Sequence, residues 1–235
     1  MPNPAPPRSV LLQLDGVVHT GDLAVQSFAR HVASAVPADR GRAVLAGMRG
    51  FLEGKPELLA AGTQLAGADL LDAEDGDRAV ELLAAAAGLG AREVAAARRA
   101  SRMDLAASAW IVEPADGVTR MLDLLDRRAS VAVLTLPDDP AAGAVLAACG
   151  LTDRVELLAL PTPAAVGRLL EGNDGEPRRV MAIGTRWSGD LEVAAAAGCL
   201  TVLVDRFGRG RGAPTWRTAG CAGLVDIVRS WIQAH

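Results

Sequence analysis

The sequence predicts an α/β fold in which a parallel, doubly wound sheet forms the core and a helical segment is inserted after the first strand. Two patterns carry this prediction. Short apolar runs ended by turn residues alternate with amphipathic segments, as strands do when helices bury both faces of their sheet. Between residues 22 and 109, however, apolar residues recur only at helical spacing, so this stretch is a block of its own.

The core is predicted to begin with a strand in residues 9–20, SVLLQLDGVVHT, whose apolar run breaks at Gly16. Later apolar runs predict four more strands, at residues 130–136, 155–160, 179–184 and 200–205. Amphipathic stretches predict five core helices, at residues 117–128, 138–149, 162–171, 190–197 and 223–233. The short links favour a Rossmann-like core, in which ligand sites form at the carboxyl ends of the strands.

The inserted block is divided by Pro and Gly residues. The breaks predict five helices, at residues 23–36, 40–52, 57–66, 75–87 and 91–110. A helical block between the first two strands of a sheet indicates an inserted cap. We therefore predict two domains, an α/β core of residues 1–20 and 111–235 and an α-helical cap of residues 21–110.

The composition excludes some classes of function. The chain has 235 residues, half of them hydrophobic, and a net charge of −4, which gives no support to a nucleic-acid or membrane partner. No apolar run reaches the roughly 20 residues that span a bilayer, and the Pro-rich start MPNPAPPRS lacks the apolar segment of a signal peptide. The three cysteines show no C-x-x-C spacing and are expected to be buried thiols. These features predict a soluble, cytoplasmic protein.

The end of the first strand, Gln13-Leu14-Asp15-Gly16, resembles the first motif of the haloacid dehalogenase-like (HAD) phosphohydrolases, an apolar strand followed by D-x-D-G-[TV]. The resemblance extends over roughly residues 9–207, is strongest to the phosphatase and phosphoglucomutase branch, and implies a helical cap that closes over the site. In that family the first aspartate attacks a phosphoryl group and the second protonates the leaving group. A Ser or Thr, a Lys and an acidic pair that binds Mg²⁺ complete the site.

The nucleophile position of this motif holds Gln13, while Asp15 and Gly16 remain. A carboxamide is neutral and a poor nucleophile, and it offers Mg²⁺ a single uncharged oxygen. Two interpretations of Gln13 stay open: it caps the end of the strand, or its amide hydrogen-bonds a ligand. His19, four residues after Asp15, is a candidate base that could face the cap.

The second and third motifs are also altered. Thr135 matches the Ser or Thr that ends the second strand, and its hydroxyl either donates to an anion or satisfies the loop that follows. Leu160 occupies the place of the motif-three lysine, at the head of Leu-Pro-Thr-Pro. The chain's only lysine, Lys55, lies in the expected cap, so Arg168 is the remaining candidate for a positive charge.

The fourth motif, G-D-S-W-x-x-D in the family, is similar to GTRWSGD at residues 184–190. Asp190 is kept, Thr185 replaces the first acidic ligand and Arg186 stands beside it, while Trp187 is a candidate for the wall of a pocket. Asp15 and Asp190 are therefore weak metal ligands at most, and we expect no cofactor, although the resemblance implies Mg²⁺.

The leading hypothesis is a catalytically inactive HAD-like protein that binds a small molecule or a protein partner. The expected ligand-binding residues are Gln13, Asp15, Gly16, Thr135, Arg186, Trp187 and Asp190. Two other hypotheses remain: a hydrolase of a small phosphorylated metabolite or a different reaction that uses Asp15, and a structural subunit that forms a homo-oligomer. The basic loop RFGRGR at residues 206–211 is expected to be solvated or to engage an acidic partner, not nucleic acid.

Overall fold

The computed structural model describes residues 8–55 and 69–234 and divides the chain into two compact units. One unit combines Met1–Thr20 with Glu113–His235, and the other is Gly21–Val112. The sequence placed this division two residues earlier, between residues 110 and 111. The helix expected at residues 57–66 lies outside the described residues.

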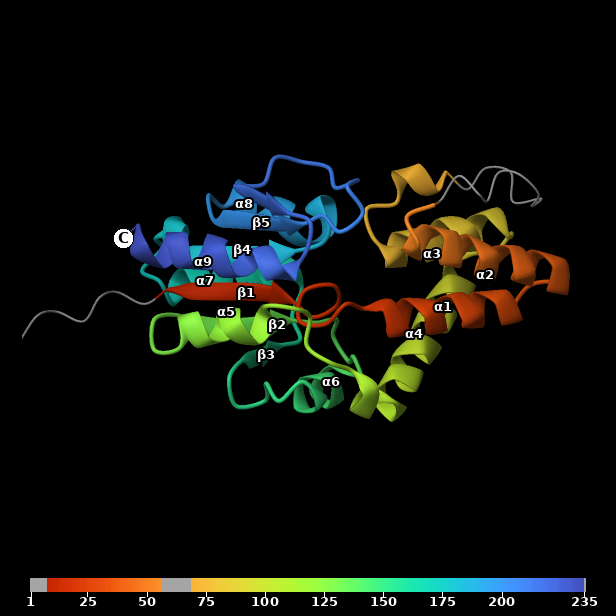
Figure 1. Cartoon of the computed structure of the whole chain (residues 1–235), viewed down its shortest axis with the longest axis horizontal. Helices are drawn as coiled ribbons and strands as arrows, with labels where there is room; N and C mark the ends of the chain where they lie inside the picture. The colour runs from red at the N-terminus through yellow and green to blue at the C-terminus, as the bar shows by residue number, and fades with distance from the viewer. Residues whose placement is uncertain (1–7, 56–68, 235) are drawn as a thin grey trace, which may run out of the picture. The chain divides into compact units, whose positions relative to one another are not determined.

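The first unit contains a six-stranded sheet with the order β3-β2-β1-β4-β5-β6, in which neighbouring strands pair in parallel (Figure 1 labels β1 to β5). The strands are β1 (Ser9–Gln13), β2 (Ser130–Leu134), β3 (Glu156–Leu158), β4 (Val180–Gly184), β5 (Leu200–Val204) and β6 (Trp216–Thr218). The α/β fold with a doubly wound parallel sheet is thus confirmed. The sequence missed β6, because three residues at the edge of a sheet carry too little apolar pattern to be detected.

Helices cover both faces of this sheet. They are α5 (Val118–Leu125), α6 (Ala142–Ala148), α7 (Thr162–Glu171), α8 (Glu192–Ala196) and α9 (Leu224–Gln233). On one face α7 and α8 pack together over Leu11, and α5 packs against α9. Leu12, whose side chain points away from that of Leu11, is also fully buried. The first strand is therefore apolar on both sides, which is why it appears in the sequence as an uninterrupted hydrophobic run.

One predicted helix begins differently from the expectation. The stretch expected as a helix from residue 190 starts earlier, as a π-helical turn, η5 (Trp187–Leu191), and continues as α8. Wide turns of this kind are rare and are frequent at functional sites. This turn contains the end of the fourth motif and therefore sets the position of Asp190.

The second unit is helical, as the spacing of its apolar residues predicts. Its helices are α1 (Asp22–Ser34), α2 (Ala38–Leu52), α3 (Gly76–Ala86) and α4 (Ala91–Ala107). The α1 helix packs against the other three, and buries Phe28 completely. Asp104 of α4 accepts hydrogen bonds from Ser27 (2.5 Å) and His31 (2.8 Å), which tie α4 to α1. Within the described parts of the chain, no helix is both long and apolar enough to cross a bilayer.

Candidate functional site

The candidate residues gather where the order of the strands reverses. The chain leaves β1 toward β2 on one side, and later strands continue from β4 on the other side, so β1 and β4 flank the switch point of the sheet. Gln13 is the last residue of β1, and Thr185 follows the last residue of β4. Gly16 has φ +79°, and a Cβ built on it would lie 2.5 Å from Cγ2 of Thr185. The first and fourth motifs are therefore in direct contact, which requires glycine at position 16.

Asp15 and His19 form a hydrogen-bonded pair just beyond β1. Nε2 of His19 lies 2.9 Å from Oδ1 of Asp15, and the imidazole is 3% exposed while the carboxylate is 41% exposed. The buried ring thus orients a carboxylate that solvent can reach. The sequence analysis named both residues but did not pair them. Their side chains are four residues apart in the chain and meet only because the backbone turns between them.

The carboxamide oxygen of Gln13 has no hydrogen-bond donor in the part of the chain that the structure describes. This atom, Oε1, is buried. A buried acceptor left in this way costs about 1–3 kcal/mol, so such groups usually have a ligand or a water as partner.

The side chain of Asp190 is held by the backbone of the two residues that follow β4. Its Oδ2 accepts hydrogen bonds from the N–H groups of Thr185 (3.2 Å) and Arg186 (2.9 Å). Its Oδ1 lies 3.7 Å from Nη2 of Arg186, and the residue is 7% exposed. A Cβ at Gly184 would come within 2.7 Å of Cβ of Asp190. The carboxylate therefore closes the π-helical turn onto the end of β4.

Thr135 is likewise engaged inside the protein. Its Oγ1 donates to Oδ2 of Asp139 (2.7 Å), and Oδ1 of Asp139 accepts the N–H of Ala141 (3.0 Å). Of the two roles considered for this hydroxyl, the geometry corresponds to the one that orders the loop after β2.

With this geometry established, the chain can be compared with known proteins. No model of a protein family matches the sequence, and no curated protein matches it. Solved structures do match. A haloacid dehalogenase-like family hydrolase from Xanthomonas campestris superposes with a TM-score of 0.55 at 18% identity, over 99% of this chain and 94% of that one.

Two more matches have different activities in their names. A β-phosphoglucomutase from Clostridium difficile gives a TM-score of 0.57 at 12% identity, over 97% and 98% of the two chains. A 2-haloacid dehalogenase from Pseudomonas syringae gives 0.52 at 18% identity, over 96% and 99%. The fold is that of the HAD-like hydrolases. Because a mutase and a dehalogenase share it, the HAD-like fold alone does not specify a reaction.

Leu160, which the sequence analysis aligned with the motif-three lysine, has apolar surroundings. Leu160 is partly buried and packs against the hydrophobic cluster beneath α7 and α8. Arg168, the candidate replacement, pairs instead with Glu156 (2.5 Å), the first residue of β3. The amino end of β3 and the candidate site lie at opposite ends of the parallel strands. The hypothesis that Arg168 reaches over to the site is therefore wrong.

Trp187, expected to line a pocket, makes a close packing contact. A Cβ built on Gly212, which has φ +81°, would lie 2.0 Å from Cδ2 of the indole. The ring therefore lies directly on the backbone of the loop that follows β5. This contact couples the π-helical turn to that loop.

Asp205, which follows β5, is a residue that the sequence analysis missed. Its Oδ1 accepts the N–H groups of Arg209 (2.8 Å) and Gly210 (2.9 Å), and its Oδ2 lies 2.6 Å from Nη1 of Arg217. Burial alone would raise the pKa of Asp205, but the bonds from Gly210, Arg217 and Arg209 outweigh it and lower that pKa. The basic loop at residues 206–211 is thus folded around a buried carboxylate; an Asp directly after an apolar strand was the signal available in the sequence.

We expect Asp205→Asn to destabilise the protein by about 2 kcal/mol at pH 7, because it removes a charge-assisted bond to Arg217. A carboxyl whose pKa is lower in the folded state stabilises the fold above its unfolded pKa of about 3.9, and this contribution is lost as the pH falls through the folded pKa. Urea denaturation between pH 7 and pH 3 should therefore show a smaller acid loss for the variant. In an Arg217→Gln background, Asp205→Asn should cost clearly less, and equal costs in both backgrounds would contradict this account.

The three cysteines are free and buried, as expected. Burial raises the pKa of the Cys221 thiol to about 11, so the sulfur keeps its proton. The thiol lies 3.5 Å from the carbonyl oxygen of Gly16 and 3.4 Å from that of Val17. Cys221 thus contacts the backbone of the loop directly after Asp15.

The donor set can be tested against the Mg²⁺ that the HAD-like fold implies. Among the described residues, no group of three or more His, Cys, Asp or Glu side chains could hold a metal ion. Asp190 is committed to two N–H groups and a guanidinium, and Gln13 offers an uncharged oxygen. Mg²⁺ prefers carboxylates in near-octahedral geometry, so these residues fit it poorly.

Proposed function

We propose that this protein binds a small polar molecule at the carboxyl ends of β1 and β4 and does not hydrolyse phosphate esters through an aspartyl phosphate. Two observations carry the proposal together: β1 ends in a carboxamide, Gln13, and the carboxylate of Asp190, which follows β4, already accepts the N–H groups of Thr185 and Arg186. A carboxamide cannot form the acyl phosphate on which that chemistry depends.

The charge of the site also disfavours a phosphate dianion. Asp15 presents an exposed carboxylate, Leu160 supplies no cation, and the Arg186 guanidinium lies beside Asp190. Phosphoryl transfer needs positive charge around the transferred oxygens. A phosphate bound here would instead face the carboxylate of Asp15, and two negative charges in contact repel each other.

The groups that remain favour a ligand that donates hydrogen bonds. The Oε1 of Gln13 is an acceptor that receives no hydrogen bond from the described residues, and the carboxylate of Asp15, oriented by His19, is a second acceptor. A neutral or cationic small molecule with hydroxyl or amino groups satisfies both acceptors. We place Gln13 and Asp15 at the centre of the site, with Thr185 and Gly16 forming its floor.

A thermal-shift and activity experiment tests this proposal. The wild-type protein should show no turnover of p-nitrophenyl phosphate with excess MgCl₂, and neither Mg²⁺ nor inorganic phosphate should raise its Tm, because only a ligand of the folded state stabilises it. As a control, the combined variant Gln13→Asp, Leu160→Lys and Thr185→Asp restores the family's polar groups and should gain a Mg²⁺-dependent rise in Tm. Turnover by the wild type that disappears in Asp15→Asn would overturn the proposal.

A second candidate function rests on the Asp15–His19 pair. A solvent-accessible carboxylate oriented by a buried imidazole at 2.9 Å can act as a general acid or base in a reaction without an aspartyl phosphate. In that case activity toward a substrate that is not a phosphate ester would be lost in Asp15→Asn, while its pH profile would shift in His19→Gln. Under the binding proposal, both variants change affinity only.

A further inference from the structure

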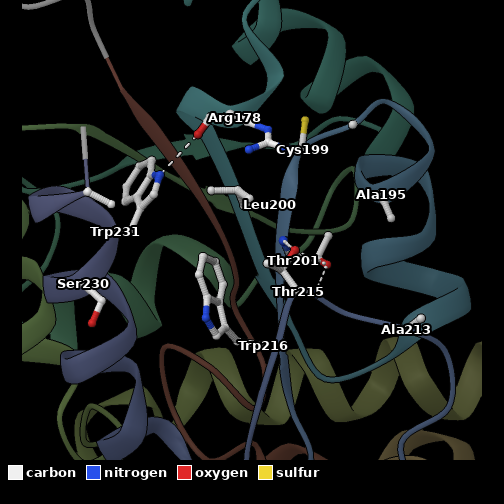
Figure 2. A pocket seen from close by; sticks show the side chains of 12 residues that line it. Arg178, Ala195, Cys199, Leu200, Thr201, Ala213, Thr215, Trp216, Ser230 and Trp231 are labelled. Carbon is white, nitrogen blue, oxygen red and sulfur yellow. Dashed lines mark hydrogen bonds between the residues drawn. The ribbon is translucent and has the colours of Figure 1, made fainter.

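A pocket lies at the amino ends of β5 and β6, away from the candidate site. Its volume is about 620 Å³, and its lining includes the first residues of β5 and β6, Leu200 and Trp216 (Figure 2). Asp15 and Asp190, by contrast, follow the last residues of β1 and β4. Because the strands are parallel, these two locations are at opposite ends of the sheet, and a ligand in one does not occupy the other.

Two indole rings form part of the wall of this pocket. Trp216 starts β6 and is half-buried, while Trp231 comes from α9 and is 2% exposed. Figure 2 labels both side chains, with Leu200 beside Trp231 and above Trp216 in this view. Indoles offer large apolar faces on which planar rings stack. A volume of this size is in the range of pockets that bind small molecules.

The wall is held in place by hydrogen bonds within the protein. Nε1 of Trp231 donates to the carbonyl oxygen of Arg178 (3.2 Å). Thr201 and Thr215 bond reciprocally, each backbone N–H donating to the hydroxyl oxygen of the other at 3.0 Å. The guanidinium of Arg8 lies 5.4 Å from the centre of the Trp231 ring and fixes it further. A pocket ordered in this way loses little conformational entropy when a ligand binds.

The charge of the pocket has one sign. Of the twelve lining residues, all within the described parts of the chain, Arg178 is the one that is charged at neutral pH, and none is acidic. Arg178 is exposed, and the structure records no ion pair for it within those described parts. Burial raises the pKa of the Cys199 thiol to about 11, so this lining residue is neutral. A guanidinium without a carboxylate partner is suited to bind a carboxylate.

We propose that this pocket binds a small aromatic carboxylate, whose ring stacks on the half-buried indole of Trp216, next to Trp231, and whose anionic group pairs with Arg178. The ring occupies the apolar part of the wall, and the hydroxyls of Thr201 and Thr215 border it. The site is independent of Gln13 and Asp15. This proposal would stand even if the function proposed for the site at the carboxyl ends of β1 and β4 proved wrong.

The probe for this proposal is 2-naphthoate, and its neutral isostere, naphthalene-2-carboxamide, is the matched ligand control. We label the four tryptophans of the full chain with ¹⁵N and follow their indole N–H signals, assigned by Trp→Phe variants. Naphthoate should shift the signals of Trp216 and Trp231 and leave that of Trp187 unchanged. A fragment of this size is expected to bind with a Kd of roughly 0.1–1 mM.

Two arginine variants separate the proposed contact from general charge. Arg178→Gln should weaken naphthoate about five- to tenfold and leave the carboxamide unaffected, since an exposed charged hydrogen bond is lost. Arg179→Gln removes the neighbouring arginine, which does not line the pocket, and should change neither affinity. Equal affinities for acid and amide, an unchanged affinity in Arg178→Gln, a shift confined to Trp187, or no shift at millimolar naphthoate would each overturn the proposal.

Discussion

Asp190→Ala is expected to lower the free energy of unfolding by about 3 kcal/mol in the absence of any metal, because it strands the donors that this buried carboxylate satisfies. The N–H groups of Thr185 and Arg186 lose their acceptor, and the Arg186 guanidinium loses a charge 3.7 Å away. Urea denaturation in EDTA measures this loss. A loss of stability in EDTA indicates a structural role for Asp190, because a carboxylate that serves chiefly as a metal ligand contributes little stability until the metal binds.

Two further variants calibrate this result. Asp190→Asn keeps an oxygen for the two N–H groups and loses only the charge, so it should cost about 1 kcal/mol. Asp226→Ala removes an exposed carboxylate, paired with Arg229, and should cost less than about 1 kcal/mol. If Asp190→Ala left the metal-free protein as stable as the wild type and abolished a Mg²⁺-dependent rise in Tm, Asp190 would be a metal ligand after all.

Gly212→Ala should destabilise the protein by about 3 kcal/mol, for two separate reasons. The backbone at φ +81° costs a non-glycine residue about 1–2 kcal/mol, and the new Cβ would lie 2.0 Å from the Trp187 ring, which adds about 1–3 kcal/mol of overpacking. Since Trp187 starts the turn that holds Asp190, the strain reaches the candidate site. The measurement is again the free energy of unfolding from urea denaturation.

Gly208→Ala is the matched control for the backbone part of this effect. Gly208 has φ +67°, and a Cβ there would meet nothing within 4 Å, so the cost should be about 1 kcal/mol. In a Trp187→Ala background the steric part disappears, and Gly212→Ala should then cost about as little as Gly208→Ala. Similar losses for Gly212→Ala and Gly208→Ala in the wild-type background would mean that the indole contact carries no strain.

Much of the fold follows from local patterns in the sequence. The strand at β1 and the helix α7, which the sequence bounded at residues 162–171, are both where the apolar spacing places them. Such elements can be predicted because burial on one or both sides imposes a periodicity on the chain itself. The π-helical turn and β6 could not be predicted, since each depends on contacts with distant segments and leaves no periodicity of its own.

The candidate site divides in the same way. The order of the motifs predicts Gln13 in the place of an aspartate, Leu160 in the place of a lysine and a retained Asp15. Their partners could not be recognised. Nothing in the sequence indicates that Thr135 donates to Asp139, or that Arg168 pairs with Glu156 away from the site.

The sequence by itself therefore determined the layered α/β architecture and the presence of a carboxamide, Gln13, at the end of the first strand, because burial periodicity and side-chain chemistry are properties of the residues alone. Only the tertiary structure decided how the retained polar groups are used: Asp190 by the backbone of its own turn, Asp15 by His19, and Asp205 by Arg217. The physical reason is that a carboxylate acts according to which donors surround it, and backbone turns that exist only in the folded chain bring those donors within hydrogen-bonding distance.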